Sequence, residues 1–221
     1  MFRDIKAVIF DIDGTIMDSI GRICECMEYA CVETGLKAPT KEATKEIIGL
    51  TLYEAVETLF PGEKAEQINK TVELYKQVYT ERENEHPTSL FTDCISVVTD
   101  LKQKGYRIGI ATGKSRKGYN RIMSYIGLKD LVDVSCTGDE VRSKPDPQML
   151  LRLSDELLLP PKACLMVGDS TLDLTMAQRA MMESAGVTTG VHSRARLETI
   201  KPTVITDSLT ELDQLLPGCK K

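Results

Sequence analysis

Short apolar runs alternate with stretches of helical periodicity along most of this chain. The apolar runs predict buried strands near residues 6–11, 107–111, 132–135, 163–167, 186–188 and 203–205. Helical spacing predicts the intervening helices near residues 95–105, 116–126, 148–158, 171–182 and 208–216. Strands that alternate with helices indicate the α/β class, with a Rossmann-like, doubly wound parallel sheet covered by helices on both faces.

The stretch from about residue 19 to residue 84 has a different pattern. Ile23, Met27 and Cys31 recur at helical spacing, and breaks at glycine and proline separate this pattern from further helical ones. Because no run in this stretch predicts a strand, we expect an all-helical domain inserted into the α/β core, with hinges near residues 15–19 and 85–90. The predicted domain bounds are 1–17 and 88–221 for the core and 18–87 for the helical insert.

Composition narrows the possible functions. The chain has 221 residues, 42% of them hydrophobic, and a formal net charge of −5. It lacks a long basic run, which argues against nucleic acid as a partner, and lacks the roughly 20 apolar residues in a row that cross a bilayer. The first six residues do not resemble a signal peptide, and the seven cysteines have no framework-like spacing. These features predict a cytoplasmic protein, without a membrane partner, whose thiols are reduced.

The most informative polar residues stand directly after the first apolar run. Asp11 and Asp13 precede Gly14 and Thr15 at the point where the predicted strand ends. One such carboxylate can attack a substrate, the other can move a proton, and together they can hold a hard cation. Because an acidic pair before a glycine is also common in turns and caps, this motif needs support from elsewhere in the chain.

Three further polar clusters follow later apolar runs. Residues 111–115, Ala-Thr-Gly-Lys-Ser, offer a hydroxyl and backbone amides that can hold an anion ahead of a helix. Lys144 begins the run Lys-Pro-Asp-Pro, whose prolines restrict the backbone around a possible phosphate partner. Asp169 and Asp173 stand about one helical turn apart. Each cluster alone also fits a turn or cap, but parallel strands would bring all four to one edge of the sheet.

This ordered set resembles the haloacid dehalogenase superfamily, in its phosphoglycolate phosphatase-like branch with a small helical cap. The motifs that carry the resemblance are Asp11-x-Asp13-Gly14-Thr15, Thr112, Lys144 and Gly168-Asp169-x-x-x-Asp173, with the helical insert between the first two. The resemblance covers nearly the whole chain and implies a phosphoric monoester hydrolase that acts on a small phosphorylated metabolite. The chain departs from relatives near Met181, where a glycine often follows the helix.

The resemblance also implies roles for the site residues. Asp11 is expected to attack phosphorus and form an aspartyl-phosphate. Asp13 is expected to protonate the leaving alcohol and then to accept a proton from water. Thr112 and the Gly113 amide would hold phosphoryl oxygens, and Lys144 would offset negative charge on the nucleophile and the phosphate.

Mg²⁺ is the cofactor that the resemblance implies. Its expected ligands are the Asp11 carboxylate, the Asp13 backbone carbonyl and Asp169. Asp173 is expected to lie behind these ligands, where it would orient Lys144 or a metal-bound water. Because several carboxylates would face a phosphate dianion, both the cation and the lysine are required.

The substrate is less well defined by the sequence. Gly49, in the segment Ile48-Gly49-Leu50-Thr51, is the candidate for a cap residue that leans over the leaving group. Arg22, Tyr79 and Arg82 are possible partners of a substrate carboxylate, although each also fits a solvated helix face.

Three alternative functions stay open beside the phosphatase. A sugar phosphomutase would use the same Asp11 and Asp13 but return the phosphoryl group to a sugar. An inorganic pyrophosphatase would cover a second phosphate with the small cap, and a regulatory protein would bind phosphate without turnover. An acid at position 13 favours hydrolysis over a long-lived phosphoenzyme. The sequence is compatible with a monomer or a homodimer.

Overall fold

Six parallel strands form a single sheet at the centre of the molecule. The computed structural model describes residues 2 and 4–219, and the sheet order is β3-β2-β1-β4-β5-β6. The strands are β1 (Ala7–Phe10), β2 (Arg107–Thr112), β3 (Val134–Thr137), β4 (Cys164–Gly168), β5 (Glu183–Val187) and β6 (Val204–Thr206). All neighbouring strands pair in parallel, which confirms the α/β, doubly wound prediction.

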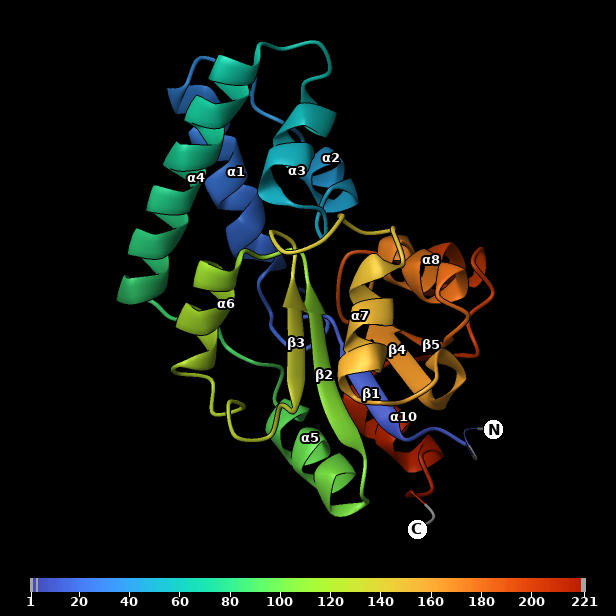
Figure 1. Ribbon diagram of the computed structural model, residues 1–221. Coiled ribbons are helices and arrows are strands. Elements are labelled where there is room, and N and C mark those ends of the chain that lie inside the picture. Colours follow the sequence, from blue (N-terminus) through green and yellow to red (C-terminus); the bar gives the residue numbers. More distant parts are fainter. Residues whose placement is uncertain (1, 3, 220–221) are drawn as a thin grey trace.

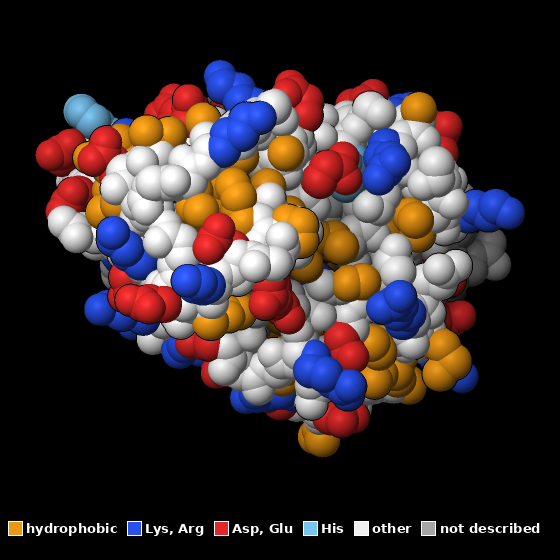
Figure 2. Space-filling model, turned by 90° about the horizontal axis from the view of Figure 1, so that it is seen from above, with side chains coloured by type: hydrophobic (Ala, Val, Ile, Leu, Met, Phe, Trp, Pro, Cys, Tyr) orange, Lys and Arg blue, Asp and Glu red, His pale blue; other side chains and the backbone are white. Residues whose placement is uncertain are grey.

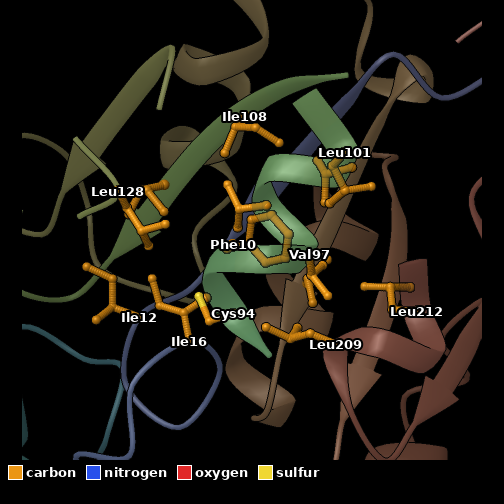
Figure 3. Packing of buried hydrophobic residues seen from close by; sticks show 14 of the residues in the cluster. Phe10, Ile12, Ile16, Cys94, Val97, Leu101, Ile108, Leu128, Leu209 and Leu212 are labelled. Atoms are coloured by element: carbon orange, nitrogen blue, oxygen red, sulfur yellow. The ribbon is translucent and has the colours of Figure 1, made fainter. Parts of the chain in front are cut away.

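Helices cover both faces of this sheet because each strand serves two layers. Successive side chains of a strand point to opposite faces, so Val8 and Phe10 join one buried cluster while Ala7 and Ile9 join another. Phe10 packs beside Val97 and Leu101 of one helix layer (Figure 3). The helices of the core are α5 (Cys94–Gln103), α6 (Arg116–Met123), α7 (Gln148–Glu156), α8 (Thr171–Arg179), α9 (Arg194–Glu198) and α10 (Leu209–Leu215), with a 3₁₀ turn at Pro161–Ala163.

Four further helices stand together beyond the carboxyl ends of the strands (Figure 1). They are α1 (Ile20–Glu33), α2 (Lys41–Glu46), α3 (Leu52–Leu59) and α4 (Ala65–Glu85), and we call them the cap. Apolar residues on α1, α3 and α4 form a buried cluster of their own. The two connections to the core run side by side, since the Asp18 amide donates to Ser89 O over 3.0 Å and the Phe91 amide donates to Ile16 O over 3.0 Å. The exact domain bounds and the hinges remain predictions.

The C-terminal part of the core differs most from the sequence prediction between α8 and β5. The helix expected over 171–182 ends at Arg179, and β5 begins at Glu183 rather than near residue 186. The reason is Met181, which has a φ of 56°; its left-handed backbone lets the Met182 amide donate to Ala177 O over 3.0 Å and close the helix. Met181 therefore occupies the conformation that a glycine adopts most readily.

The chain order places the carboxyl end of β1 at a topological switch point. From β1 the chain continues to β2 on one side, and β4 lies on the other. In open α/β sheets such a reversal leaves a crevice outside the strand ends, where ligands bind. Seen from above, the face that carries the cap has hydrophobic side chains exposed among charged ones (Figure 2). Within the described part of the chain, no helix is both long and apolar enough to span a membrane.

Candidate active site

Lys144 connects two of the predicted acidic clusters. Its ammonium donates to Asp11 Oδ1 over 2.7 Å and to Asp173 Oδ1 over 2.6 Å. Lys144 is 2% exposed, and a buried ammonium is tolerated only when it is paired and hydrogen-bonded. Burial lowers the pKa of Lys144, but the two carboxylates outweigh it and raise that pKa above its ordinary value. The ammonium is therefore held charged and in a fixed position.

Asp173 is oriented by the start of α8. Its Oδ2 accepts from Ser170 Oγ over 2.5 Å and from the Ser170 amide over 3.3 Å. Together with the bond from the Asp173 amide to Ser170 Oγ, this is a capping box. The other carboxylate oxygen is left for Lys144. Asp173 therefore contacts Lys144, which is one of the two partners expected for it.

Asp169 is held from two sides. Thr15 Oγ1 donates to its Oδ1 over 2.9 Å, and the Val191 amide donates to its Oδ2 over 2.7 Å. The backbone of Gly14 passes so close that a Cβ there would lie 2.4 Å from Asp169 Oδ2, and its φ is +81°. Glycine is required at this position for both reasons. The sequence placed Thr15 in the first motif without a role, and the structure gives it this bond.

Asp11, Asp169 and Asp173 form a buried carboxylate cluster. Each offers an oxygen within 4.8 Å of the others. Burial raises the pKa of Asp11 to about 7, with Lys144 opposing and Asp173 and Asp13 adding to the rise. Burial, together with Asp173 and Asp11, also raises the pKa of Asp169 well above its ordinary value. Of these three acids, Lys144 pairs with Asp11 and Asp173 and not with Asp169. Negative charge therefore remains in the cluster, which fits a divalent cation bound by oxygen ligands.

The side chain of Asp13 has different partners from the carboxylate cluster. Its Oδ1 accepts from Ser19 Oγ over 2.5 Å and lies 2.8 Å from Lys114 Nζ. Although burial lowers the pKa of Lys114, Asp13 raises it above the ordinary value. The sequence prediction missed Lys114: it lies in the Ala-Thr-Gly-Lys-Ser run, which was interpreted as an anion cradle formed by its hydroxyl and amides.

Thr112, Gly113 and Gly49 meet where the cap touches the core. Thr112 is buried, and its Oγ1 accepts from the Lys114 amide over 3.2 Å. A Cβ on Gly113 would lie 2.5 Å from Gly49 O, and a Cβ on Gly49 would lie 3.9 Å from Lys144 Cδ. The Thr51 amide donates to Ser143 Oγ over 3.0 Å. The cap loop, residues 48–51, is therefore seated over the predicted phosphate-binding residues.

The three residues considered as partners of a substrate carboxylate have different surroundings in the structure. Arg22 donates to Glu83 Oε2 over 3.0 Å and to Arg82 O. The Arg82 guanidinium faces Glu25 at 3.3 Å. Tyr79, in contrast, lines a cavity of about 840 Å³ between the cap and α6, together with Asp13. Only Tyr79 of these three residues is placed beside the predicted site.

Comparisons with known proteins identify the family of this chain. The family model described as haloacid dehalogenase-like hydrolase matches residues 8–187. The chain is 31% identical to "Probable phosphatase IndB" of Dickeya dadantii, over 93% of this chain and 90% of that protein. It is 28% identical to pyrophosphatase PpaX of Bacillus cereus (98% and 99% covered) and 23% identical to a phosphoglycolate phosphatase of Nitrosococcus oceani (98% of each).

A solved structure supports the fold over the same length. The crystal structure of a haloacid dehalogenase-like hydrolase from Bacteroides fragilis superposes with a TM-score of 0.83 and 30% identity. The superposition covers 96% of this chain and all of that one. The similarity therefore includes the cap as well as the sheet.

Proposed function

Because the chain belongs to the haloacid dehalogenase-like hydrolase family, we propose that it is a magnesium-dependent phosphatase of the phosphoglycolate phosphatase-like branch. Its substrate is a small phosphorylated metabolite, and Asp11 carries the phosphoryl group as an aspartyl-phosphate. The observation that carries this proposal is the buried Lys144 ammonium, bound to Asp11 and Asp173 beside the end of β1. An ammonium in this position offsets charge at the nucleophile and at the phosphoryl oxygens.

The two halves of the reaction use the two acids that follow β1. Asp11 attacks phosphorus, the phosphorus–oxygen bond to the alcohol breaks, and Asp13 gives its proton to the departing alcohol oxygen. In the second half Asp13 takes a proton from a water that attacks the same phosphorus. Asp11 is then released and phosphate leaves. Asp13 suits this role because its side chain faces the cavity rather than the carboxylate cluster.

The phosphoryl oxygens are held by neutral and positive groups. Thr112 and the Gly113 amide stand next to the cap loop, and Lys144 reaches the same place from the other side. Asp11, Asp169 and the Asp13 carbonyl would hold Mg²⁺, which supplies positive charge against the phosphate dianion when bound. Asp173 keeps Lys144 in position, and the seated cap loop limits the access of water.

Phosphate release from a panel of phosphomonoesters tests this proposal. The native protein is expected to release phosphate with Mg²⁺ and to stop when a chelator removes the metal. Asp11→Asn removes the nucleophile at nearly constant size and should lower kcat by about 10³-fold or more. Asp155→Asn, on the exposed side of α7, is the matched control and should keep full activity. Full activity of Asp11→Asn would refute the proposal.

Pyrophosphate hydrolysis is the second candidate function. It is favoured by the PpaX relatives, whose length the chain matches almost completely. Pyrophosphate therefore belongs in the panel, and a kcat/KM at least ten times that of any ester would assign this activity instead. Interconversion of sugar phosphates without phosphate release would indicate a mutase.

A further inference from the structure

The cavity between the cap and α6, which we call the chamber, lies next to the general acid expected at Asp13. It measures about 840 Å³, and Asp13, Gly113 and Lys114 line it where it meets the core. Its other walls come from the cap loop, α1, α3, α4 and α6. A leaving group bound to a phosphate at Asp11 would extend into this space, because Asp13 must reach the oxygen that departs.

The chamber is larger than the small acids of the proposed branch require. A water molecule takes a share of about 30 Å³, so a leaving group of five heavy atoms, such as glycolate, would leave most of the space to water. Its walls include apolar side chains, among them Ile48, Leu50 and Tyr75. Cavities of this size and character suit organic ligands with a sizeable apolar body.

Two buried polar atoms in the chamber wall lack hydrogen-bond partners among the described residues. Tyr79 is 5% exposed, and its Oη has no hydrogen-bond partner among the described residues. Arg121 Nε also has no hydrogen-bond partner among the described residues. Its guanidinium donates to the Thr80 hydroxyl through Nη1, but Arg121 forms no ion pair within the described part of the chain. Buried polar atoms normally have partners, so such atoms call for an explanation. A bound ligand would supply the missing acceptors.

These groups are gathered around one aromatic ring. Lys114 Nζ lies 5.1 Å from the centre of the Tyr79 ring, and the Arg121 guanidinium lies 5.8 Å from it. Lys114 is already paired with Asp13, whereas the Arg121 guanidinium donates to the neutral Thr80 hydroxyl and faces no carboxylate partner among the described residues. The acidic residues in the lining other than Asp13, which are Glu73, Glu81 and Asp139, are exposed to solvent. The buried part of the wall therefore favours a negative group on the ligand.

We propose that this chamber selects bulky phosphomonoesters whose leaving group joins an apolar body to an anionic group, which Tyr79 and Arg121 bind. The inference rests on the proposed phosphatase function and names the substrate class of that site. Tyr79 Oη donates one hydrogen bond to the anion, and the Arg121 guanidinium provides the opposite charge. The apolar walls exclude water from the body of the leaving group.

A pair of matched esters tests the inference. In 4-(carboxymethyl)phenyl phosphate and 4-ethylphenyl phosphate the reacting end is the same, and the difference is the carboxylate. The native protein should prefer the acid at least about 10-fold in kcat/KM, the effect of one charge-assisted contact. Arg121→Met should bring this ratio close to 1, and Tyr79→Phe should lower it several-fold. The ratio cancels any general loss of activity.

The cap supplies a matched control pair. Tyr29 and Arg82 form a similar contact, with the guanidinium 5.9 Å from the ring centre, but neither residue lines the chamber. Tyr29→Phe and Arg82→Met should leave the ratio as in the native protein. Circular dichroism of every variant establishes that each is folded.

Binding of the product phenols separates this inference from the proposed function. By calorimetry, 4-hydroxyphenylacetate should bind more tightly than 4-ethylphenol, and Arg121→Met should remove the difference without any turnover. A native ratio near 1 for both turnover and binding would overturn the inference while leaving a phosphatase. So would a kcat/KM for phosphoglycolate or pyrophosphate at least tenfold above either aryl ester. Selective binding without phosphate release from any ester would support the chamber and refute the phosphatase.

Discussion

The carboxylate cluster and the chamber are neighbouring regions near the end of β1, and they differ in how far the protein satisfies its own polar groups. In the carboxylate cluster, Asp169 and Asp173 each have defined donors, and Lys144 joins Asp11 to Asp173. In the chamber, Tyr79 Oη and Arg121 Nε have no partners among the described residues. The first region is organised before any substrate arrives, whereas the second is completed by what binds.

This difference corresponds to two separate functions, catalysis in the carboxylate cluster and substrate selection in the chamber. Preorganised charges lower a barrier because they need no rearrangement during the reaction. A wall with unmatched donors discriminates between ligands, because a ligand without the right acceptors leaves buried groups unpaired. The general acid expected at Asp13 lies between the two regions, and Lys114 ties it to the chamber. The first two of the following substitutions act on the carboxylate cluster and on the contact between cap and core, and the third acts on the attachment of the cap.

The largest effect is expected from Lys144→Met, in the carboxylate cluster. The variant removes the ammonium from Asp11 and Asp173 and should lower kcat by about 10³-fold. Lys162→Met, at an exposed position, is the control and should be active. Phosphate release should be measured per folded molecule, since uncompensated buried acids also lower stability. Activity within tenfold of native would contradict a role for this ammonium in catalysis.

A smaller effect is expected where cap and core meet. Gly113→Ala would place a Cβ 2.5 Å from Gly49 O and 2.6 Å from Leu50 O, so the cap loop must move. We expect kcat to fall about 10- to 100-fold because the site no longer closes to the right distance. Gly21→Ala adds a Cβ with no atom within 4 Å and should keep both activity and melting temperature. Equal kinetics of the two variants would show that the loop contact is not needed.

The smallest effect is expected from Glu83, which helps to attach the cap to the core. Burial raises the pKa of Glu83, but hydrogen bonds from Tyr125 and from the Thr88 amide and hydroxyl, with Arg22 beside it, bring that pKa below its ordinary 4.5. A carboxyl whose pKa is lower in the folded state stabilises the fold when the pH is above its ordinary pKa. This contribution is lost as the pH falls through the pKa of the folded state.

Glu83→Gln should therefore lower the free energy of unfolding by about 1–3 kcal/mol at pH 7. The difference from the native protein should shrink as the pH falls below 4.5, the ordinary pKa of this carboxyl. Thermal unfolding at several pH values measures this difference. A gap that is constant with pH would mean that the charge of Glu83 contributes nothing.

Most of the fold could be predicted from the sequence because its signals are local. The apolar run before Asp11 and the spacing of apolar residues in the helices follow from the periods of strand and helix. The boundary at Met181 could not be predicted, since a methionine in the left-handed conformation has no local signal. The helix ends there because the Met182 amide donates to Ala177 O.

The site, like the fold, could be predicted from the sequence only in part. The types and order of Asp11, Asp13, Thr112 and Lys144 predict their convergence, because parallel strands must end at one edge of the sheet. The sequence does not predict which of these side chains bind one another. Asp173 binds Lys144, and Lys144 binds Asp11 across 133 positions of sequence. Such contacts depend on how separate helices are seated on the sheet.

The sequence by itself thus determined the class of fold, the edge at which the chemistry lies and the residue types that meet there. Only the tertiary structure decided that Lys114 pairs with Asp13 and that Tyr79, rather than Arg22 or Arg82, lines the chamber. The physical reason is that strand and helix patterns extend over neighbouring residues. The shape and charge of a cavity arise from side chains that folding brings together from distant elements.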